Sequence, residues 1–573
     1  MPPRQAPLLG GRSRHLFTTL LDAVALRLAD DAPALICVAT GIAPRAVSRR
    51  EFGKRVREHG AALAALGVRP GDVLVIAHTQ ELEAIFAFWG ALVLGAIPSM
   101  FPTLTEKLDM GIYMSQVSLL IDHAGVKAVL TSDAFAPTLA GRVACPVYGS
   151  SLLAEAGAGA DGSLPPATAE PSAVAFLQHS SGTTGLQKGV ALSHTAVLNQ
   201  LASYSDALEL RRDDVVVSWL PLYHDMGLIA GFLMPLVQGL PLVLMSPFDW
   251  VAHPALLLRA IHDYRGTLCW LPNFAYNHCA RRVRKRDADG ISLASVRAFV
   301  NCSEPVRQGS HEAFLRRFAV HGARAEQLAV SYAMAENVFA ATQTPPGRPP
   351  RLDTVDRAAL EQALAARPVD PGSPSTLVSV SCGPPIDGVE VRVLDESGVT
   401  LPERRVGEMA VRSHCMLTGY YRRPDLDAAV LREGFYLTGD MGYLADGEVY
   451  IVGRKKDLII NGGRNLYPQD IEAAINTVPG VHPGRAVAFG VPDEREGTEL
   501  VAVVAEIGTE DASAQAAIAQ AIREAVIEHV GVTATWVRLV NSKWLIKTSS
   551  GKIARGANRD RWLTEQRLEP GTA

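Results

Sequence analysis

The residue types best suited to chemistry gather in one ten-residue stretch, Ser180 to Gly189, which reads Ser-Ser-Gly-Thr-Thr-Gly-Leu-Gln-Lys-Gly. It follows an apolar run at 173–177, which predicts a short buried strand. Glycines let a backbone turn sharply, and exposed amides, hydroxyls and an ammonium group can hold phosphate oxygens. The stretch is not a P-loop, because Gln187 precedes Lys188 and Gly189 follows it. It predicts a phosphate site, with a plain polar surface loop as the alternative.

Bulk composition narrows the class of protein. A chain of 573 residues is long enough for two or more domains. Its 48% hydrophobic and 20% charged residues are typical of globular proteins, and a net charge of −4 gives no general basic field for nucleic acid. The seven cysteines form no CxxC pair, which favours reduced thiols and a cytoplasmic location. No apolar segment of a secretory signal is recognised near residue 15.

Two apolar runs, at 84–101 and 228–248, reach the length of a membrane span. Pro98 ends the first run, while Pro235, Gly239 and Pro241 interrupt the second. We therefore interpret each run as a buried helix followed by a core strand, and we expect no membrane span.

Helical and short apolar segments alternate along the first part of the chain, which predicts a doubly wound α/β fold. The segments that carry this alternation are strands at 34–38 and 73–77 and helices from about Ser48, at 81–95 and at 192–208. Residues 151–171, rich in Ala, Gly and Pro, predict a surface linker.

The pattern changes in the last third of the chain. Short alternating strands at 389–394, 407–411 and 448–452 predict a small β subdomain. A compact C-terminal α/β unit is then predicted from a helix at 470–478, strands at 485–491 and 500–507, and a helix at 513–529 with Ser513 as its N-cap.

Polar residues follow several of the expected strands, where open α/β sheets bind ligands. Asn301 to Pro305 follows one strand, and Ser331 to Glu336 follows the next. Tyr332 could stack on a base, and the Glu336 carboxylate suits magnesium. His224 lies in a turn before an apolar helix and is either structural or ligand-facing. The basic run 281–288 is most simply a solvated helix end.

With these segments in view, residues 30–560 resemble the adenylate-forming superfamily of acyl-CoA synthetases, peptide-synthetase adenylation domains and luciferases. Five motifs stand in the order of that superfamily: the phosphate loop, Tyr332–Glu336, Thr438-Gly439-Asp440, Gly453–Asp457 and Ser550-Gly551-Lys552. The stretches 220–228, 272–276 and 463–470 are similar to fatty acyl-AMP ligases. So is an apparent insertion at 345–374, which in those ligases hinders the C-terminal domain from reaching a productive CoA-binding pose.

The chain departs from the family pattern at four positions. Ser180 stands where threonine is usual, Ala333 replaces a glycine, and Ala335 replaces a threonine, as is common in acyl-AMP ligases. Trp270 occupies a region in which those ligases have small residues. Its indole is expected to shorten or reshape the acyl channel.

The resemblance implies a two-domain α/β enzyme. Residues 1–452 would form a large domain of doubly wound sheets with a small β subdomain, and 453–573 a mobile α+β domain. The implied reaction joins a carboxylic acid, fatty or related, to ATP, giving acyl-adenylate and pyrophosphate with Mg²⁺. Acyl transfer to the phosphopantetheine thiol of an acyl carrier protein would follow. The alternatives are transfer to free CoA and a non-catalytic nucleotide-binding protein.

The resemblance also implies a role for each matching residue. Lys552, Glu336 and His224 are the implied catalytic residues, Lys456 the hinge, and Glu336 with Ser180 the metal ligands. The implied acyl pocket consists of His224, Trp270, Asn273, Phe274, Ala333 and Met334. ATP or AMP would be bound by Ser180, Ser181, Gly182, Thr183, Thr184, Gly185, Lys188, Ser303, Glu304, Pro305, Ser331, Tyr332, Asp440 and Arg454.

Overall fold

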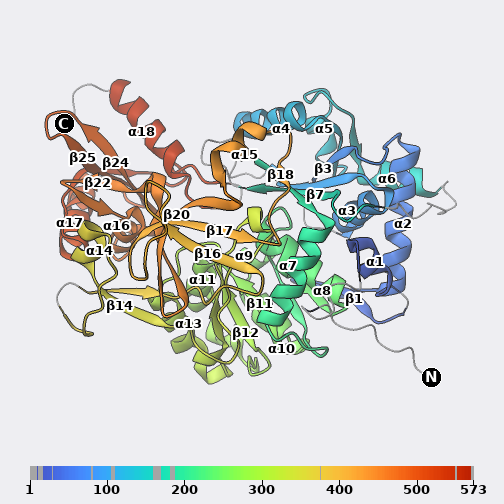
Figure 1. Cartoon of the computed structure of the whole chain (residues 1–573), viewed down its shortest axis with the longest axis horizontal. Coiled ribbons are helices and arrows are strands. Elements are labelled where there is room, and N and C mark those ends of the chain that lie inside the picture. The colour runs from blue at the N-terminus through green and yellow to red at the C-terminus, as the bar shows by residue number, and fades with distance from the viewer. Residues whose placement is uncertain are drawn as a thin grey trace.

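The computed structural model describes residue 10 and residues 17–28, 30–78, 82–104, 110–158, 169–180, 188–373, 376–548 and 552–568. The N-terminal elements, in blue, lie at one end of the molecule and the C-terminal elements, in red, at the other (Figure 1). Strands β16, β17 and β20 lie between them.

One large sheet carries the strand ends that matter for function. Within the described residues its strand order is β13-β12-β11-β9-β10-β1-β2, and all neighbours are parallel except β1 and β2. Short apolar strands of this kind are typical of parallel sheets covered on both faces. The strands are β1 (Pro33–Ala39), β2 (Ile42–Ser48), β9 (Val216–Ser218), β10 (Leu242–Leu244), β11 (Leu268–Leu271), β12 (Ala298–Asn301) and β13 (Leu328–Val330).

A second large sheet flanks the glycine-rich stretch. Its described strands run in the order β18-β8-β7-β4-β3-β5-β6, and only β8 pairs in antiparallel fashion with its neighbours. Ser180, the last residue of β7, pairs with Lys188, the first residue of β8. The strands are β3 (Val73–Ala77), β4 (Ile97–Phe101), β5 (Val126–Thr131), β6 (Val147–Gly149), β7 (Val174–Ser180), β8 (Lys188–Ser193) and β18 (Gly419–Tyr420).

One apolar core joins the two large sheets. The Phe88 ring lies 5.6 Å from that of Phe176 in β7 and 6.3 Å from that of Phe232 in the π-helix η2 (Met226–Leu233). The helices that cover the sheets are α1 (Leu20–Ala25), α2 (Arg49–Ala65), α3 (Leu82–Leu94), α4 (Met110–Ala124), α5 (Ala136–Leu139), α6 (Ser150–Ala158), α7 (His194–Ala207), α8 (Met234–Gln238), α9 (Pro247–Ala252), α10 (Ala255–Asp263), α11 (Asn273–Arg282), α12 (Lys285–Ala288) and α13 (Gln308–Phe318).

The interpretation of both long apolar runs is confirmed. The first is α3 followed by β4, and the second is η2, α8 and β10. In the part of the chain that the structure describes, no helix is long and apolar enough to cross a membrane.

Several local expectations are wrong. The expected linker at 151–171 begins as helix α6, and residues 159–168 lie outside the described ones. The helix expected from 192 starts at His194, because the residues before it pair with β7 as strand β8. Asp511, rather than Ser513, caps helix α17 by accepting a hydrogen bond from the Ala514 amide.

The predicted β subdomain is an antiparallel sheet with order β16-β17-β20-β19, in which β21 also pairs with β20. Its strands are β16 (Val389–Leu394), β17 (Gly407–Ser413), β19 (Leu431–Arg432), β20 (Phe435–Ala445) and β21 (Glu448–Arg454), and helix α15 (Pro424–Val430) precedes β19.

The small C-terminal domain has apolar cores of its own. Its helices are α16 (Pro468–Ile475), α17 (Ala512–Val530) and α18 (Arg555–Leu568). Its strands are β22 (Ile459–Asn461), β23 (Arg464–Leu466), β24 (Val481–Asp493), β25 (Thr498–Ile507) and β26 (Ala534–Val540).

The insertion forms helix α14 (Arg357–Ala363) between the paired strands β14 (Leu352–Asp356) and β15 (Thr376–Val380). In Figure 1, α14 lies beside α16 and α17. Arg464 of β23 donates a hydrogen bond of 2.6 Å to Glu361, and Asn465 donates one of 2.9 Å to the Glu361 carbonyl. The insertion therefore packs on the C-terminal domain through these polar contacts and through an apolar cluster in which Tyr467 of that domain joins Val355 and Leu360.

Candidate active site

The carboxyl ends of β11, β12 and β13 meet at one edge of the first sheet. The chain after β12, residues 302–307, forms a loop that we call the 302–307 loop. Ser303 in it has a φ of 73°, in the left-handed region that few residues other than glycine adopt. Such a conformation persists only where neighbouring contacts hold it.

Asn273, the first residue of α11, supplies those contacts. Its Oδ1 accepts hydrogen bonds from Asn301 Nδ2 and from the Arg307 amide, both at 3.1 Å. The Phe274 amide donates to Glu304 Oε2 at 3.0 Å. Both residues, which the motif assigned to the acyl pocket, thus brace the 302–307 loop, and the Phe274 side chain remains 41% exposed.

Lys552 reaches this loop from the C-terminal domain. Its Nζ donates a hydrogen bond of 2.6 Å to the Ser303 carbonyl. Residues 549–551 lie outside the described ones, but the Thr548 amide donates to the Lys552 carbonyl at 2.7 Å. The implied catalytic lysine and the implied adenine loop are thereby in direct contact.

A carboxylate and an imidazole lie near Lys552. Asp225 Oδ1 is 2.6 Å from His224 Nδ1 and accepts a hydrogen bond from the Met226 amide at the start of η2. Burial raises the pKa of the Asp225 carboxyl, but His224, the Met226 amide and Lys552 lower it more, so it lies below its usual value. Asp225 is therefore an anion that favours positive charge on its neighbours.

Asp440 and Arg454 pair across strands β20 and β21. The Tyr332 hydroxyl donates to Asp440 Oδ2 at 2.7 Å, and Arg454 Nε lies 3.2 Å from Asp440 Oδ1. Asp440 raises the pKa of the Arg454 guanidinium. The Asp440 side chain is 15% exposed.

A third polar group joins Glu336, Tyr420 and Lys188. The Tyr420 hydroxyl donates to Glu336 Oε1 at 2.8 Å, and Lys188 Nζ lies 4.7 Å from the centre of the Tyr420 ring, a cation–π distance. Burial and Glu336 raise the pKa of the Tyr420 hydroxyl. Sequence reasoning missed Tyr420, because its pairing with β8 arises only when the distant strand β18 joins the sheet.

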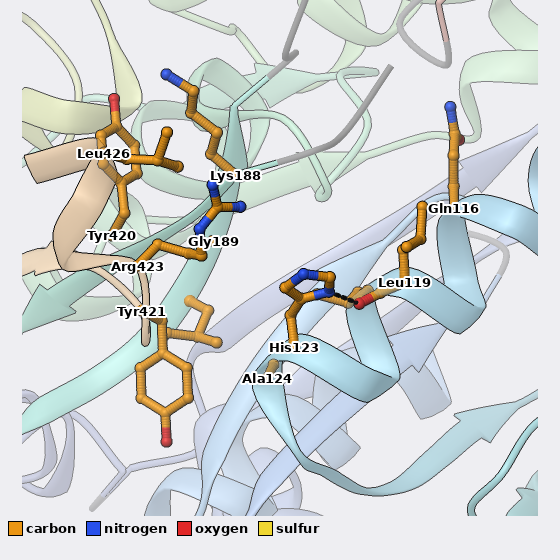
Figure 2. Close-up of a pocket in the computed structure, with 12 residues that line it drawn as sticks. Gln116, Leu119, His123, Ala124, Lys188, Gly189, Tyr420, Tyr421, Arg423 and Leu426 are labelled. Atoms are coloured by element: carbon orange, nitrogen blue, oxygen red, sulfur yellow. Dashed lines mark hydrogen bonds between the residues drawn. The ribbon is translucent and has the colours of Figure 1, made fainter. Parts of the chain in front are cut away.

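Figure 2 shows Lys188 and Tyr420 at one side of a small pocket between α4 and strand β8. Gln116 and His123 line it from α4, and Arg423 lines it from the chain after β18. Its volume of about 100 Å³ is far below the 300–1,000 Å³ of typical small-molecule sites. This pocket alone cannot hold a nucleotide.

Trp270 is fully buried near the end of β11. Its Nε1 donates to the Tyr204 hydroxyl at 2.7 Å, and that hydroxyl donates to Gln343 Oε1 at 2.9 Å. The Tyr204 hydroxyl also interacts with the Ser331 side chain, which itself donates to the Thr342 carbonyl. The indole is thus linked through Tyr204 to Ser331, the residue that follows β13.

Residues 333–340 form a tight backbone turn. Ala333 pairs with Ala340, and the Met334 amide donates to the Phe339 carbonyl at 2.8 Å. The Phe339 ring lies edge-on to Tyr204 at 5.3 Å. Ala333 and Met334 therefore lie next to the cluster that holds Trp270.

Glu336 is the carboxylate that the family resemblance implies as a metal ligand. It is 6% exposed, and the described residues contain no group of three or more His, Cys, Asp or Glu side chains arranged as a metal site. Magnesium commonly takes one or two carboxylates and completes its shell with substrate phosphates and water. The donor set fits a magnesium ion that arrives with a nucleotide. The side chain of Ser180 and all of Ser181, Gly182, Thr183, Thr184 and Gly185 lie outside the described residues.

Lys456 lies in the short 3₁₀ turn Lys455–Asp457, where the chain leaves β21 for the C-terminal domain. Burial and the nearby Arg454 lower the pKa of its ammonium group to about 8. The implied hinge is therefore close to the Asp440–Arg454 pair.

Comparison with known proteins identifies the family. The profile of the AMP-binding enzyme family matches residues 21–421. The chain belongs to this family. It is 30% identical over 581 residues to the long-chain-fatty-acid–AMP ligase FadD32 of Mycolicibacterium smegmatis, covering 91% of this chain and 89% of that protein.

Two further proteins are similar. The medium-chain-fatty-acid–[acyl-carrier-protein] ligase JamA of Moorena producens is 35% identical over 407 residues, 68% of each chain. A solved structure from a study of fatty acyl-adenylate ligases of E. coli and L. pneumophila has a TM-score of 0.87 and 26% identity, covering 96% of this chain and 98% of its own. The resemblance to adenylate-forming ligases and the expected doubly wound fold with a small C-terminal domain are confirmed.

The Asp440 carboxylate should contribute strongly to nucleotide binding. Asp440→Asn removes the charge that would accept hydrogen bonds from ribose hydroxyls, and hydrogen bonds to charged groups are worth about 1.5–3 kcal/mol. We expect calorimetric titration to show ATP affinity lowered about 10–100-fold. Asp425→Asn, which changes an exposed carboxylate paired with Arg423, is the matched control. Unchanged ATP affinity in the Asp440 variant would count against this assignment.

Proposed function

We propose that this enzyme activates a fatty or related carboxylic acid with ATP, releases pyrophosphate, and passes the acyl group to the phosphopantetheine thiol of an acyl carrier protein. The contact between Lys552 and the Ser303 carbonyl carries the proposal. It brings a lysine of the C-terminal domain to the edge of the first sheet, where Asp440 and Glu336 also lie. His224 and Asp225 lie there too, and we expect them to be on the side that binds the carboxylic acid.

In the activation step a carboxylate oxygen attacks the α-phosphorus of ATP, and the bond to the β-phosphate oxygen breaks. Negative charge grows on the phosphate oxygens, so catalysis depends on positioning and electrostatic stabilisation. Lys552 would neutralise this charge while holding the carboxylate in line. His224 would orient the acyl end through its contact with Asp225.

The remaining residues would hold the nucleotide. Asp440 would accept hydrogen bonds from the ribose, with Arg454 beside it, while Ser303, Glu304, Pro305, Ser331 and Tyr332 would line the adenine site. Lys188 and the stretch that contains Ser181, Gly182, Thr183, Thr184 and Gly185 would hold the departing pyrophosphate. Magnesium, held by Glu336 with Ser180, would neutralise phosphate charge.

Transfer to the thiol requires the catalytic lysine to leave. We assign the hinge to Lys456, between a large domain that ends near residue 452 and a C-terminal domain that begins at 453. Rotation about this turn would carry Lys552 away and open a path to the adenylate.

The acyl pocket would be compact. Trp270, held by Tyr204 and Gln343, would form its floor, and Ala333 and Met334 would form its wall. A rigid indole at that depth favours short or medium acyl groups.

Replacement of Lys552 tests the proposed function. Lys552→Ala should lower acid-dependent pyrophosphate release about 100-fold or more, because one preorganised electrostatic contact of this kind is worth roughly 3 kcal/mol. Lys543→Ala, at an exposed lysine of the same domain, is the control. Wild-type release by the Lys552 variant would contradict the proposed role. No release from any acid of a broad panel would favour a non-catalytic nucleotide-binding protein.

Replacement of Trp270 tests the pocket floor. Trp270→Leu should raise kcat/KM for long straight-chain acids relative to short ones by about tenfold, because a methylene that gains a pocket is worth about 1–3 kcal/mol. Trp270→Phe, which loses the bond to Tyr204 but keeps much of the volume, should shift the preference less. The same chain-length profile in all three proteins would show that Trp270 does not limit the acyl group.

The identity of the acyl acceptor distinguishes the proposed carrier-protein ligase from the alternative, in which free CoA accepts the acyl group. The polar contacts of Glu361 with β23 tie the insertion to the C-terminal domain and favour a carrier, as does the likeness to a carrier-protein ligase. With ATP and a preferred acid, we expect a mass increase on a holo carrier protein and little acyl-CoA in a matched reaction with free CoA. Efficient acyl-CoA formation, with an unchanged holo carrier, would support the alternative.

A further inference from the structure

We propose that the ion pair between Arg307 and Asp470 is a positioning latch, which seats the C-terminal domain for acid activation and must open before thiol transfer. Arg307 Nη1 donates to Asp470 Oδ1 at 2.8 Å, and the two side chains are 34% and 14% exposed. Arg307 ends the 302–307 loop, and Asp470 lies in the first turn of α16 in the C-terminal domain. This inference rests on the proposed role of Lys552.

The same short loop receives two contacts from the C-terminal domain. Lys552 binds the Ser303 carbonyl at one end of the loop, and Asp470 binds Arg307 at the other. Asn273 fixes the loop from below through the Arg307 amide and through Asn301. The ion pair and the Lys552 contact therefore both position the C-terminal domain against the same braced loop of the large domain.

The two contacts are also joined within the C-terminal domain. Arg555, which begins helix α18 just after Lys552, donates to Glu472 Oε1 and to Asp457 Oδ2, both at 2.7 Å. Glu472 lies in α16, the helix that carries Asp470. These contacts form a closed circuit. It runs from the 302–307 loop through Asp470 and α16 to Arg555, along the chain to Lys552, and back to the loop. Seating α16 at Arg307 seats Lys552.

The modest strength of the Arg307–Asp470 ion pair suits a contact that must form and break. An ion pair of intermediate exposure is worth little by itself, yet loss of Arg307 would leave the largely covered Asp470 carboxylate unpaired. A modest preference for one domain pose changes the fraction of enzyme competent for activation without changing the substrate site. The expected signature is a lower kcat with an unaltered KM.

The test measures the two half-reactions separately. Asp470→Asn and Arg307→Gln should lower kcat for pyrophosphate release about 5–30-fold, leave KM for ATP unchanged, and leave thioester formation from added acyl-adenylate and holo carrier equal or faster. The exchanged pair Arg307→Asp with Asp470→Arg should restore most of the activation rate. Arg284→Asp, which breaks an exposed pair within the large domain, is the control.

Two results would overturn the latch. One is an unchanged activation rate in both single variants. The other is an equal loss in both half-reactions without recovery in the exchanged pair, which indicates a merely structural contact. Small-angle X-ray scattering gives a readout independent of activity, since Asp470→Asn should increase the radius of gyration. Absence of acid-dependent pyrophosphate release from the wild-type enzyme would refute the proposed function, and the activating role of the latch with it, whereas wild-type release with an unchanged radius and intact activation in Asp470→Asn would refute the latch alone.

Discussion

The hydrogen bond from Lys552 to the Ser303 carbonyl sets the constraint that the rest of the structure serves. In the proposed function, a lysine in a small C-terminal domain must reach a loop of the large domain with ångström accuracy, because displacements of that size are costly to a catalytic group. The large domain meets this demand with a loop that holds Ser303 in a left-handed conformation and is braced by Asn273. The small domain meets it with Arg555, which ties the lysine segment to α16.

The polar groups around this contact compensate one another in the absence of substrate. Asp225 is matched by His224 and Lys552, Asp440 by Arg454 and Tyr332, and Glu336 by Tyr420. Buried carboxylates without such partners would be protonated or would destabilise the fold. A bound nucleotide would replace some of these partners of the three carboxylates. The side chains are therefore preorganised, and substrate binding exchanges one set of polar contacts for another.

Much of this arrangement could be predicted from sequence, where a residue acts through its own local motif. Asp440, Lys552, Glu336 and the 303–305 segment stand in short patterns that preserve their spacing, and the apolar runs at β3 and β16 match the observed strands. Tyr420, Arg307 and the bracing role of Asn273, which its motif assigned to the acyl pocket, could not be recognised in this way. Their partners lie far along the chain, so their contacts exist only after strands and domains have come together. The errors at α6, β8 and Asp511 are local, because turn, strand and capping signals compete within a few residues.

The chemistry of the domain contacts suits an interface that is accurate and, in the proposed function, temporary. The described contacts of the C-terminal domain with the rest of the chain include Lys552 with Ser303, Asp470 with Arg307, and Arg464 with Glu361, and all three are polar. Apolar packing contributes as well, because Tyr467 of the C-terminal domain belongs to the cluster of Val355 and Leu360, and more of it would hold the domain more firmly. Directional polar contacts define a single seating while water can replace them when they open. An interface rich in polar contacts is typical of domains that move relative to one another, as the proposed withdrawal of Lys552 after activation requires.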